Sequence, residues 1–166
     1  MPKSQNDLFA RFAELEIITK TVTHPPLFTV EASKSLRGQI PGGHTKNLFL
    51  KDKKGTLFLV VALESAEIDL KRLHGKIGAS GRLSFGKPEL LQEKLGVFPG
   101  SVTPFALINN DGLDVTVILD APMMQEAVLN YHPLENTATT AISNQDLLAF
   151  IRSCGHEPKI LHVSDA

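Results

Sequence analysis

The sequence has little cysteine, few aromatic side chains and no excess of charge of either sign. Cys154 is its single cysteine, which excludes an internal disulfide and fits a reducing compartment such as the cytoplasm. Its 17 lysines and arginines stand against 18 aspartates and glutamates, for a formal net charge of -1. This balance does not favour a DNA partner, and any RNA partner would have to be held by a local basic patch.

Long apolar runs are absent as well. None approaches the ~20 residues that cross a bilayer, and residues 2–7 are polar, without the apolar core of a signal peptide. The sequence therefore predicts a cytoplasmic protein with no membrane partner.

The common cofactor and catalytic motifs are missing. There is no Gly-x-x-x-x-Gly-Lys-Ser/Thr phosphate loop, no Gly-x-Gly-x-x-Gly after a strand and no Gly-x-Ser-x-Gly elbow. Six scattered histidines and one cysteine show no zinc-ligand spacing. We expect neither a metal nor a cofactor, and we interpret Cys154 as core filler rather than as a nucleophile.

The composition is that of one globular domain. The chain has 166 residues, of which 42% are apolar and 21% charged, enough for a real core in a single domain over residues 1–166. End signals and helical spacing predict five helices: over 5–15 behind a capping box at Ser4, from Thr29 to Gly38, from Asp69 to before Gly78, from Pro88 to Gly96, and from Ser143 to Gly155.

Strand patterns occupy much of the remaining chain. Strands are predicted over 17–23, up to about 52 in the next segment, and over 56–63, 82–85, 105–108, 115–119, 128–131, 137–142 and 160–163, with one helical turn near 121–124. Strands and helices do not alternate regularly, which argues against a doubly wound parallel sheet. We expect an α/β protein of the α+β type, with a mixed, mostly antiparallel, curved or barrel-like sheet and about five surrounding helices.

The most informative stretch is residues 42–50, which read GGHTKNLFL. Two glycines allow a tight turn, and the apolar end reads as a buried strand. Side chains alternate along a strand, so Lys46 shares a face with Leu48 and Leu50. Such a lysine is either an electrostatic catalyst and anion anchor or a strand-end lysine that reaches water past its apolar neighbours.

Three loops carry polar chemistry near predicted strands. They are residues 42–47, residues 100–104 with free backbone N–H groups, and residues 132–136 with a His-Pro pair. Each loop alone also reads as an ordinary turn. Because each adjoins a buried strand, the three are candidates to meet at one end of a sheet.

Four segments together resemble a known family. THPPLFTVEA at 23–32, TKNLFL at 45–50, GSVTP at 100–104 and YHP with NTA at 131–138 are similar to the YbaK and prolyl-tRNA-synthetase-associated editing domains. Within that family the chain most resembles the free-standing alanyl-tRNA(Pro) deacylases, over about residues 8–163. The resemblance implies hydrolysis of mischarged Ala-tRNA(Pro) by a pocket too small for proline, since a missing methylene is worth only ~1–3 kcal/mol in the synthetase's own pocket.

The resemblance also implies roles for individual residues. Lys46 matches the family's essential lysine, Gly100 its Gly-x-x-x-Pro loop and His132 its pocket histidine. No serine or cysteine in this set looks like an activated nucleophile, so we expect direct attack by water on the ester and hypothesise that the neighbouring ribose hydroxyl helps to move the proton. The remaining substrate-binding candidates are Asn47, Ser101, Val102, Thr103, Pro104 and Asn136, with Phe28, Val30 and Leu36 lining the size-excluding pocket or belonging to the core.

RNA contacts and alternative functions complete these expectations. The basic candidates near Lys46 are Lys34, Arg37, Lys51, Lys53 and Lys54, which otherwise form a solvated charged turn. Prolyl-tRNA synthetase and elongation factor are candidate protein partners. The alternative functions are a deacylase for cysteine or serine and a module that binds tRNA or a synthetase without catalysis; a metal-dependent hydrolase ranks below both.

Overall fold

The computed structural model describes residues 2–26 and 40–165. The helix expected between Thr29 and Gly38 lies outside the described residues. Four α-helices occur within them: α1 (Gln5–Glu14), α3 (Leu70–Ile77), α4 (Pro88–Leu95) and α5 (Asn144–Ser153). Three short 3-10 helices accompany them: η1 (Pro99–Ser101), η2 (Pro104–Asn109) and η3 (Met123–Gln125).

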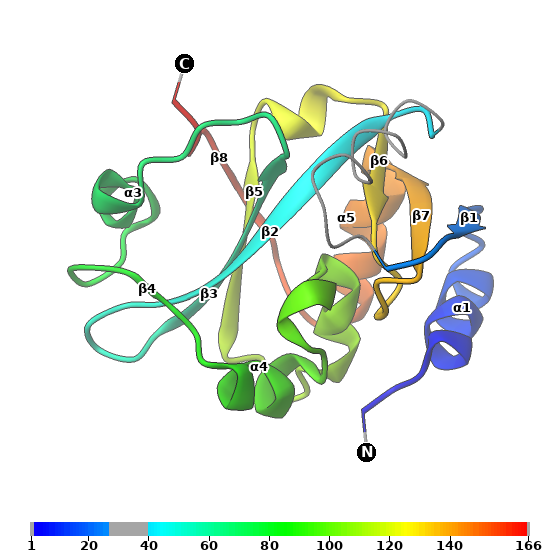
Figure 1. Cartoon of the computed structure of the whole chain (residues 1–166), viewed down its shortest axis with the longest axis horizontal. Coiled ribbons are helices and arrows are strands. Elements are labelled where there is room, and N and C mark those ends of the chain that lie inside the picture. Colours follow the sequence, from blue (N-terminus) through cyan, green and yellow to red (C-terminus); the bar gives the residue numbers. More distant parts are fainter. Residues whose placement is uncertain (1, 27–39, 166) are drawn as a thin grey trace.

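An eight-stranded mixed sheet forms the centre of the molecule (Figure 1). Its strands are β1 (Lys20–Thr23), β2 (Gly43–Lys51), β3 (Leu57–Leu63), β4 (Ser84–Phe85), β5 (Val115–Asp120), β6 (Val128–Tyr131), β7 (Ala138–Ser143) and β8 (Lys159–Leu161). The order is β1-β7-β6-β2-β3-β5-β8, and β4 pairs with β2 beside this path. Of the seven pairings in the described part, four are antiparallel and three parallel, which confirms the expected mixed sheet.

Local end signals set the helices where the sequence predicts them. Ser4 and Asp7 form the predicted capping box of α1. Asp69 caps α3 by accepting the backbone N–H of Lys71 at 3.0 Å. Gly96 ends α4 with a φ of 66°, a left-handed conformation that glycine adopts without steric cost. These contacts lie within a few residues of one another, so the sequence pattern alone is sufficient to predict them.

The strand predicted over 105–108 is wrong. This segment belongs to the 3-10 helix η2, where Thr103 accepts the N–H of Phe105 and Pro104 occupies the first turn. Residues 104–108 are all buried, so neither a period of two nor a helical period is visible in the apolar pattern. Other strands are also shorter than expected: β1 begins at Lys20, β3 at Leu57 and β4 at Ser84, and β8 ends at Leu161.

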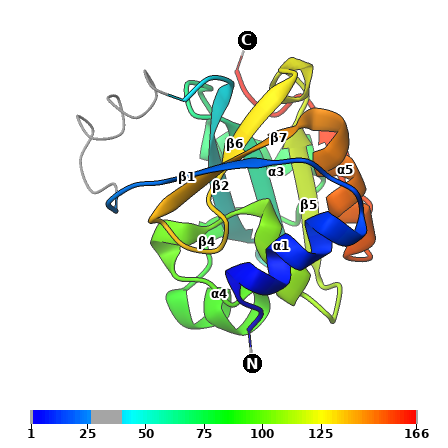
Figure 2. The same cartoon turned by 90° about the vertical axis from the view of Figure 1, so that its right-hand side faces the viewer.

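Each face of the sheet has its own core. We call the face that carries Phe49, Val117 and Leu119 the α5 face, because it packs on the larger cluster with α1, α4, α5 and η2. The opposite face carries Leu50 and Ile118, packs against α3, and is called the α3 face. Figure 2 shows α1 and α5 together beside β1 and β7 (α3 lies behind). In the described part of the chain, no helix is long and apolar enough to cross a membrane.

Candidate functional site

Strand β2 joins two groups of strands: β1, β7 and β6 on one side and β3, β5 and β8 on the other. The candidate site lies where β2 diverges from β6. Strand β2 pairs with β6 in parallel only at Gly43 with Leu129 and His44 with Asn130. Beyond that point β2 continues along β3 and β4. A hydrogen bond joins β2 and β6 at this point: the Thr45 hydroxyl donates to the Asn130 carbonyl at 2.6 Å.

The junction of β2 and β6 also fixes the conformation of the glycine turn. The Asn130 side-chain amide donates to the carbonyls of Pro41 (3.1 Å) and Gly43 (3.3 Å). Gly42 has a φ of 102°, and a Cβ on it would lie 3.0 Å from the Asn130 amide nitrogen. A glycine is therefore required at position 42, both for its backbone conformation and for the close approach of Asn130.

Lys46 lies on the α3 face, as the alternation predicts. Its strand neighbours Leu48 and Leu50 pack in the α3-face cluster, and Ala62 of β3 is its register partner. The half-buried side chain ends in a hydrogen bond from Nζ to the carbonyl oxygen of Ala66, in the loop that leads to α3. The ammonium group thus stands at the end of the apolar side chains of Leu48 and Leu50, where the Ala66 carbonyl accepts its hydrogen bond.

His132 shares this face with Lys46. Each residue lies two positions beyond the last β2–β6 pair, His44 with Asn130, so alternation directs both side chains to the α3 face. His132 Nδ1 lies 2.9 Å from the Ala138 carbonyl. Since a carbonyl only accepts, the proton of the neutral ring is on Nδ1, and Nε2 carries the lone pair. Burial lowers the pKa of His132, with a smaller contribution from nearby His24, so the ring is neutral near pH 7.

His24 completes a pair of imidazoles at this place. Its ring centroid lies 6.3 Å from that of His132. His24 Nδ1 faces the Pro25 carbonyl at 2.8 Å, and Nε2 accepts from the Thr139 hydroxyl at 2.8 Å. From the sequence, His24 belongs to the family-resembling segment 23–32 and Thr139 to a predicted strand, and neither is a site candidate. Their approach to His132 depends on β1 pairing with β7, which no local pattern reveals.

The loop of residues 100–104, called the Gly100 element, lies beside the turn between β6 and β7. Gly100 itself is exposed at η1, whereas Ser101, Thr103 and Pro104 are buried and Val102 packs partly into the α5-face core. A Cβ on Gly100 would lie 3.4 Å from the side-chain amide nitrogen of Asn136. Asn136 ends the 132–136 loop, so two of the three chemically interesting loops are neighbours.

Asn47 points away from Lys46. The two residues are consecutive in β2, so their side chains lie on opposite faces of the sheet. Asn47 Oδ1 is buried and has no hydrogen-bond partner within the described residues. The structure therefore groups Lys46 with His132 on the α3 face, and places Asn47 on the α5 face.

The other candidates are farther away or outside the description. Lys51 ends β2, and Lys53 and Lys54 are exposed in the β2–β3 turn. Lys51 lies five positions after Lys46 in β2, about 17 Å away at the usual rise per residue. Phe28, Val30, Lys34, Leu36 and Arg37 lie outside the described residues.

A cavity of about 460 Å³ lies between β1, β6 and the glycine turn, and its lining residues include neither His24 nor His132. Val22, Val128 and Ala141 line it from β1, β6 and β7, and Lys20 and Glu126 contribute charged groups. The pairing of Ala141 with Asn130 places this lining on the face that carries His132. For metals, the search over residues 2–26 and 40–165 finds no cluster of three His, Cys, Asp or Glu side chains able to hold an ion.

Comparison with known proteins identifies the family. The profile of the aminoacyl-tRNA editing domain matches residues 24–150, which include β2, the Gly100 element and His132. The chain belongs to the aminoacyl-tRNA editing domain family. The expected resemblance to the prolyl-tRNA-synthetase-associated editing domains is thereby confirmed.

The sequence similarity to relatives covers more than nine tenths of the chain. The chain is 40% identical over 156 residues to the bovine (Bos taurus) prolyl-tRNA synthetase associated domain-containing protein 1, covering 92% of this chain and 91% of the relative. It is 33% identical over 157 residues to the prolyl-tRNA editing protein ProX of Acetoanaerobium sticklandii, covering 94% and 95%.

Solved structures support the fold of the editing domain. A crystal structure described as a candidate trans-editing enzyme for prolyl-tRNA synthetase superposes with a TM-score of 0.70 at 21% identity, covering 98% of this chain and 94% of that one. At this identity the similarity concerns the fold alone. It matches the mixed sheet and surrounding helices described above.

Proposed function

We propose that this editing domain hydrolyses the aminoacyl ester of Ala-tRNA(Pro) and releases alanine and tRNA(Pro). The observation that carries the proposal is the placement of Lys46 and His132 on one face, beside a turn that contacts the Gly100 element. A cation, a neutral imidazole and a backbone loop are the groups needed to bind an anionic RNA end, an amino acid and a developing oxyanion. The ProX relative, a prolyl-tRNA editing protein by name, supports the tRNA identity.

In the proposed mechanism Lys46 binds the substrate's 3′ end, through a phosphate or the ester region. His132 Nε2, which carries the lone pair of the neutral ring, accepts a hydrogen from the ammonium group of alanine. The Ser101 N–H already donates to the Phe98 carbonyl at 2.8 Å. The N–H groups of Gly100 and Val102 are therefore the proposed oxyanion donors.

Water is the proposed nucleophile, and the neighbouring ribose hydroxyl helps move the proton. Ser101 is buried, and its backbone N–H is hydrogen-bonded within η1. Burial raises the pKa of the Cys154 thiol, which packs against the α5-face core away from the site. Neither side chain is placed as an activated nucleophile.

The substrate's RNA body meets a different part of the domain in this proposal. Lys51, Lys53 and Lys54, at the far end of β2, are proposed to contact acceptor-stem phosphates. Such contacts are salt-sensitive and add affinity without selecting the amino acid. The proposed substrate implies action in the cytoplasm, with the synthetase or elongation factor as candidate partners.

The proposal is tested by deacylation of tRNA(Pro) charged with alanine, proline, cysteine or serine, measured side by side. We expect fast loss of alanine and at least about 100-fold slower loss of proline, since a pocket closed to a larger ring excludes it sterically. Preferred loss of cysteine or serine would make the domain a deacylase of another specificity. Absence of hydrolysis with retained tRNA binding would favour the non-catalytic module.

The pH dependence of deacylation tests the role of His132. We expect kcat/KM to fall as the pH drops below the ordinary histidine value of 6.5, because burial keeps the folded pKa below that value and only the neutral ring accepts from the ammonium group. The measurement is kcat/KM between about pH 5 and 8. In His132→Gln this acid limb should disappear; an unchanged limb would assign it to another group.

The same pKa shift affects folding in a defined direction. With the folded pKa lowered from 6.5, the unfolded chain binds more protons on His132 than the folded chain in the window between the two values. The contribution of neutral His132 to the free energy of unfolding is therefore present above pH 6.5 and decreases as the pH falls through that window. Acid urea titrations of wild type and His132→Gln should differ in this range.

A further inference from the structure

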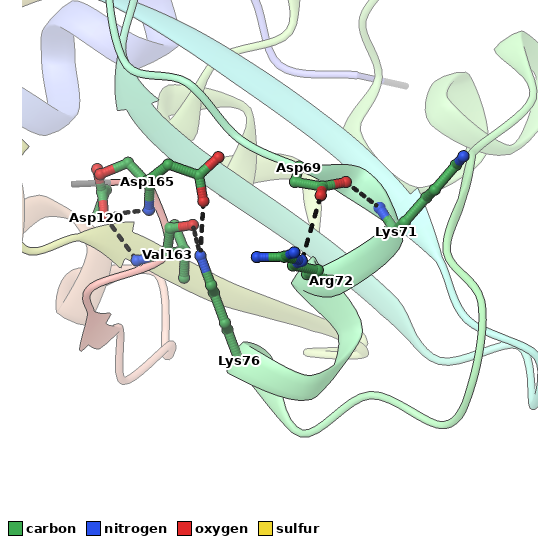
Figure 3. Close-up of polar contacts among 8 residues, drawn as sticks. Asp69, Lys71, Arg72, Lys76, Asp120, Val163 and Asp165 are labelled. Carbon is green, nitrogen blue, oxygen red and sulfur yellow. Dashed lines mark hydrogen bonds and ion pairs between the residues drawn. The ribbon is translucent and has the colours of Figure 1, made fainter.

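Hydrogen bonds with Asp120 and Lys76 hold residues 163–165 beside the end of β5, and we call these contacts the clasp (Figure 3). Asp120 Oδ1, at the end of β5, accepts the backbone N–H groups of Val163 (2.8 Å) and Ser164 (3.2 Å). Lys76 of α3 donates from Nζ to the Val163 carbonyl and to Asp165 Oδ1, both at 3.2 Å. Two elements, β5 and α3, thus hold four backbone and side-chain groups of this segment.

The clasped segment holds the loop that carries the acceptor of Lys46. The Asp165 N–H donates to the Glu67 carbonyl at 2.7 Å. The preceding carbonyl, that of Ala66, is the one that accepts Lys46 Nζ. The position of the Lys46 ammonium group is therefore linked, through residues 66–67 and 163–165, to the carboxylate of Asp120.

Asp120 also faces Lys46 across a single strand. Lys46 is paired with Ala62, and the β3–β5 register, which ends at Val61 with Leu119, puts Asp120 beside Ala62. Since both flank Ala62, Lys46 and Asp120 lie on the α3 face, two strand spacings or about 10 Å apart at the backbone. No other strand separates the two charged side chains.

Only one carboxylate oxygen of Asp120, Oδ1, takes part in the clasp. The residue has 0% exposure. Its second oxygen, Oδ2, is buried and has no hydrogen-bond partner within residues 2–26 and 40–165. A buried carboxylate oxygen without a partner is energetically costly unless its charge serves another group. Two cations lie on this side of the sheet: Lys76, which already donates to the Val163 carbonyl and to Asp165, and Lys46.

We propose that Asp120 is a positioning residue for Lys46. Its Oδ1 anchors residues 163–164, which fix residues 66–67 and hence the Ala66 carbonyl that orients Nζ. The negative charge of the same carboxylate attracts the ammonium group of Lys46. The inference rests on the proposed function, in which Lys46 binds the substrate's 3′ end, and it explains how a lysine on a flexible stem keeps one orientation.

The test is a double-mutant cycle in binding affinity. The probe is a tRNA(Pro) acceptor analogue that carries alanine through a stable amide, so that binding is measured without turnover. We expect Asp120→Asn, which keeps shape and one acceptor oxygen but removes the charge, to raise Kd about tenfold. In the Lys46→Ala background the same change should leave Kd unaltered, because Asp120 acts through Lys46. An equal weakening in both backgrounds, or no weakening in either, would overturn the proposal.

Asp69→Asn is the matched control. It makes the same change of charge on the same side of the molecule, at an exposed helix cap whose function asparagine also fulfils. We expect Kd to be unchanged in this variant. A tenfold rise here as well would mean that bulk charge, not the clasp, sets affinity, and would contradict the proposal.

A second measurement separates this inference from the proposed function. Deleting residues 164–166 removes two backbone donors of the clasp and leaves Asp120 in place. We expect faster amide hydrogen exchange over residues 63–67 in this variant and in Asp120→Asn, with exchange over residues 57–62 of β3 preserved. If the wild type neither binds nor cleaves the aminoacyl probes, the proposed function fails. If exchange at 63–67 does not change in either variant, the clasp fails instead.

Discussion

Replacing Lys46 with alanine lowers kcat/KM for Ala-tRNA(Pro) deacylation by about 100-fold or more. A preorganised charged donor in a partly desolvated site typically contributes a factor of 10²–10³ to rate. Lys46 meets that description, because its stem lies beside Leu48 and Leu50 and its ammonium group is held by the Ala66 carbonyl. The measurement is single-turnover loss of radiolabelled alanine from charged tRNA(Pro).

Folding is measured in parallel, because the substitution also removes a hydrogen bond from a charged group, worth about 1.5–3 kcal/mol. Lys71→Ala is the matched control: this lysine is exposed on α3 and only its backbone N–H takes part in the helix cap. The control should retain full activity. A folded Lys46→Ala variant with wild-type rates would remove Lys46 from the proposed mechanism.

Replacing Phe105 with alanine lowers the free energy of unfolding by about 3–5 kcal/mol, as expected for a phenylalanine in the centre of a core. Phe105 has 0% exposure. Its ring centroid lies 5.2 Å from that of Phe12, 5.6 Å from Tyr131 and 5.4 Å from Phe150. Three elements, α1, β6 and α5, meet on this one side chain, so the cavity left by its removal cannot be closed by a local shift.

Urea unfolding followed by circular dichroism measures this effect. Phe98→Ala is the matched control, because Phe98 lies seven residues earlier in the same connection but is 73% exposed. It should change the free energy of unfolding by no more than about 0.5 kcal/mol. A loss below about 1.5 kcal/mol for Phe105→Ala would mean that the aromatic cluster is not central to the core.

The sequence predicts well where a structure depends on neighbours in the chain. The capping box at Ser4, the cap at Asp69 and the stop at Gly96 join groups a few residues apart, and all three are confirmed. The β2–β3 hairpin follows the same rule, because a short turn joins two apolar strands. Residues 105–108 mark the limit: their apolar run is compatible with a strand or a helix, and burial on all sides removes the period that would distinguish them.

The candidate site depends on both kinds of information. Alternation along β2 is local, so the shared face of Lys46, Leu48 and Leu50 follows from the sequence and is confirmed. The same alternation places Asn47 and Lys46 on opposite faces of the sheet, although both belong to the loop of residues 42–47 that was expected to act as one unit. Family resemblance supplied the choice of Lys46, Gly100 and His132, and their catalytic and binding roles stay predictions.

By itself, the sequence determined the helix ends, the hairpin, the mixed sheet and the membership of the editing family, because each depends on local backbone chemistry or on motifs in a given order. Only the tertiary structure decided that His24 lies beside His132, that Gly100 meets Asn136, and that Asp120 shares a face with Lys46. These approaches join residues far apart in the chain. They are fixed by strand order and register, which arise from the packing of the whole sheet between its two cores.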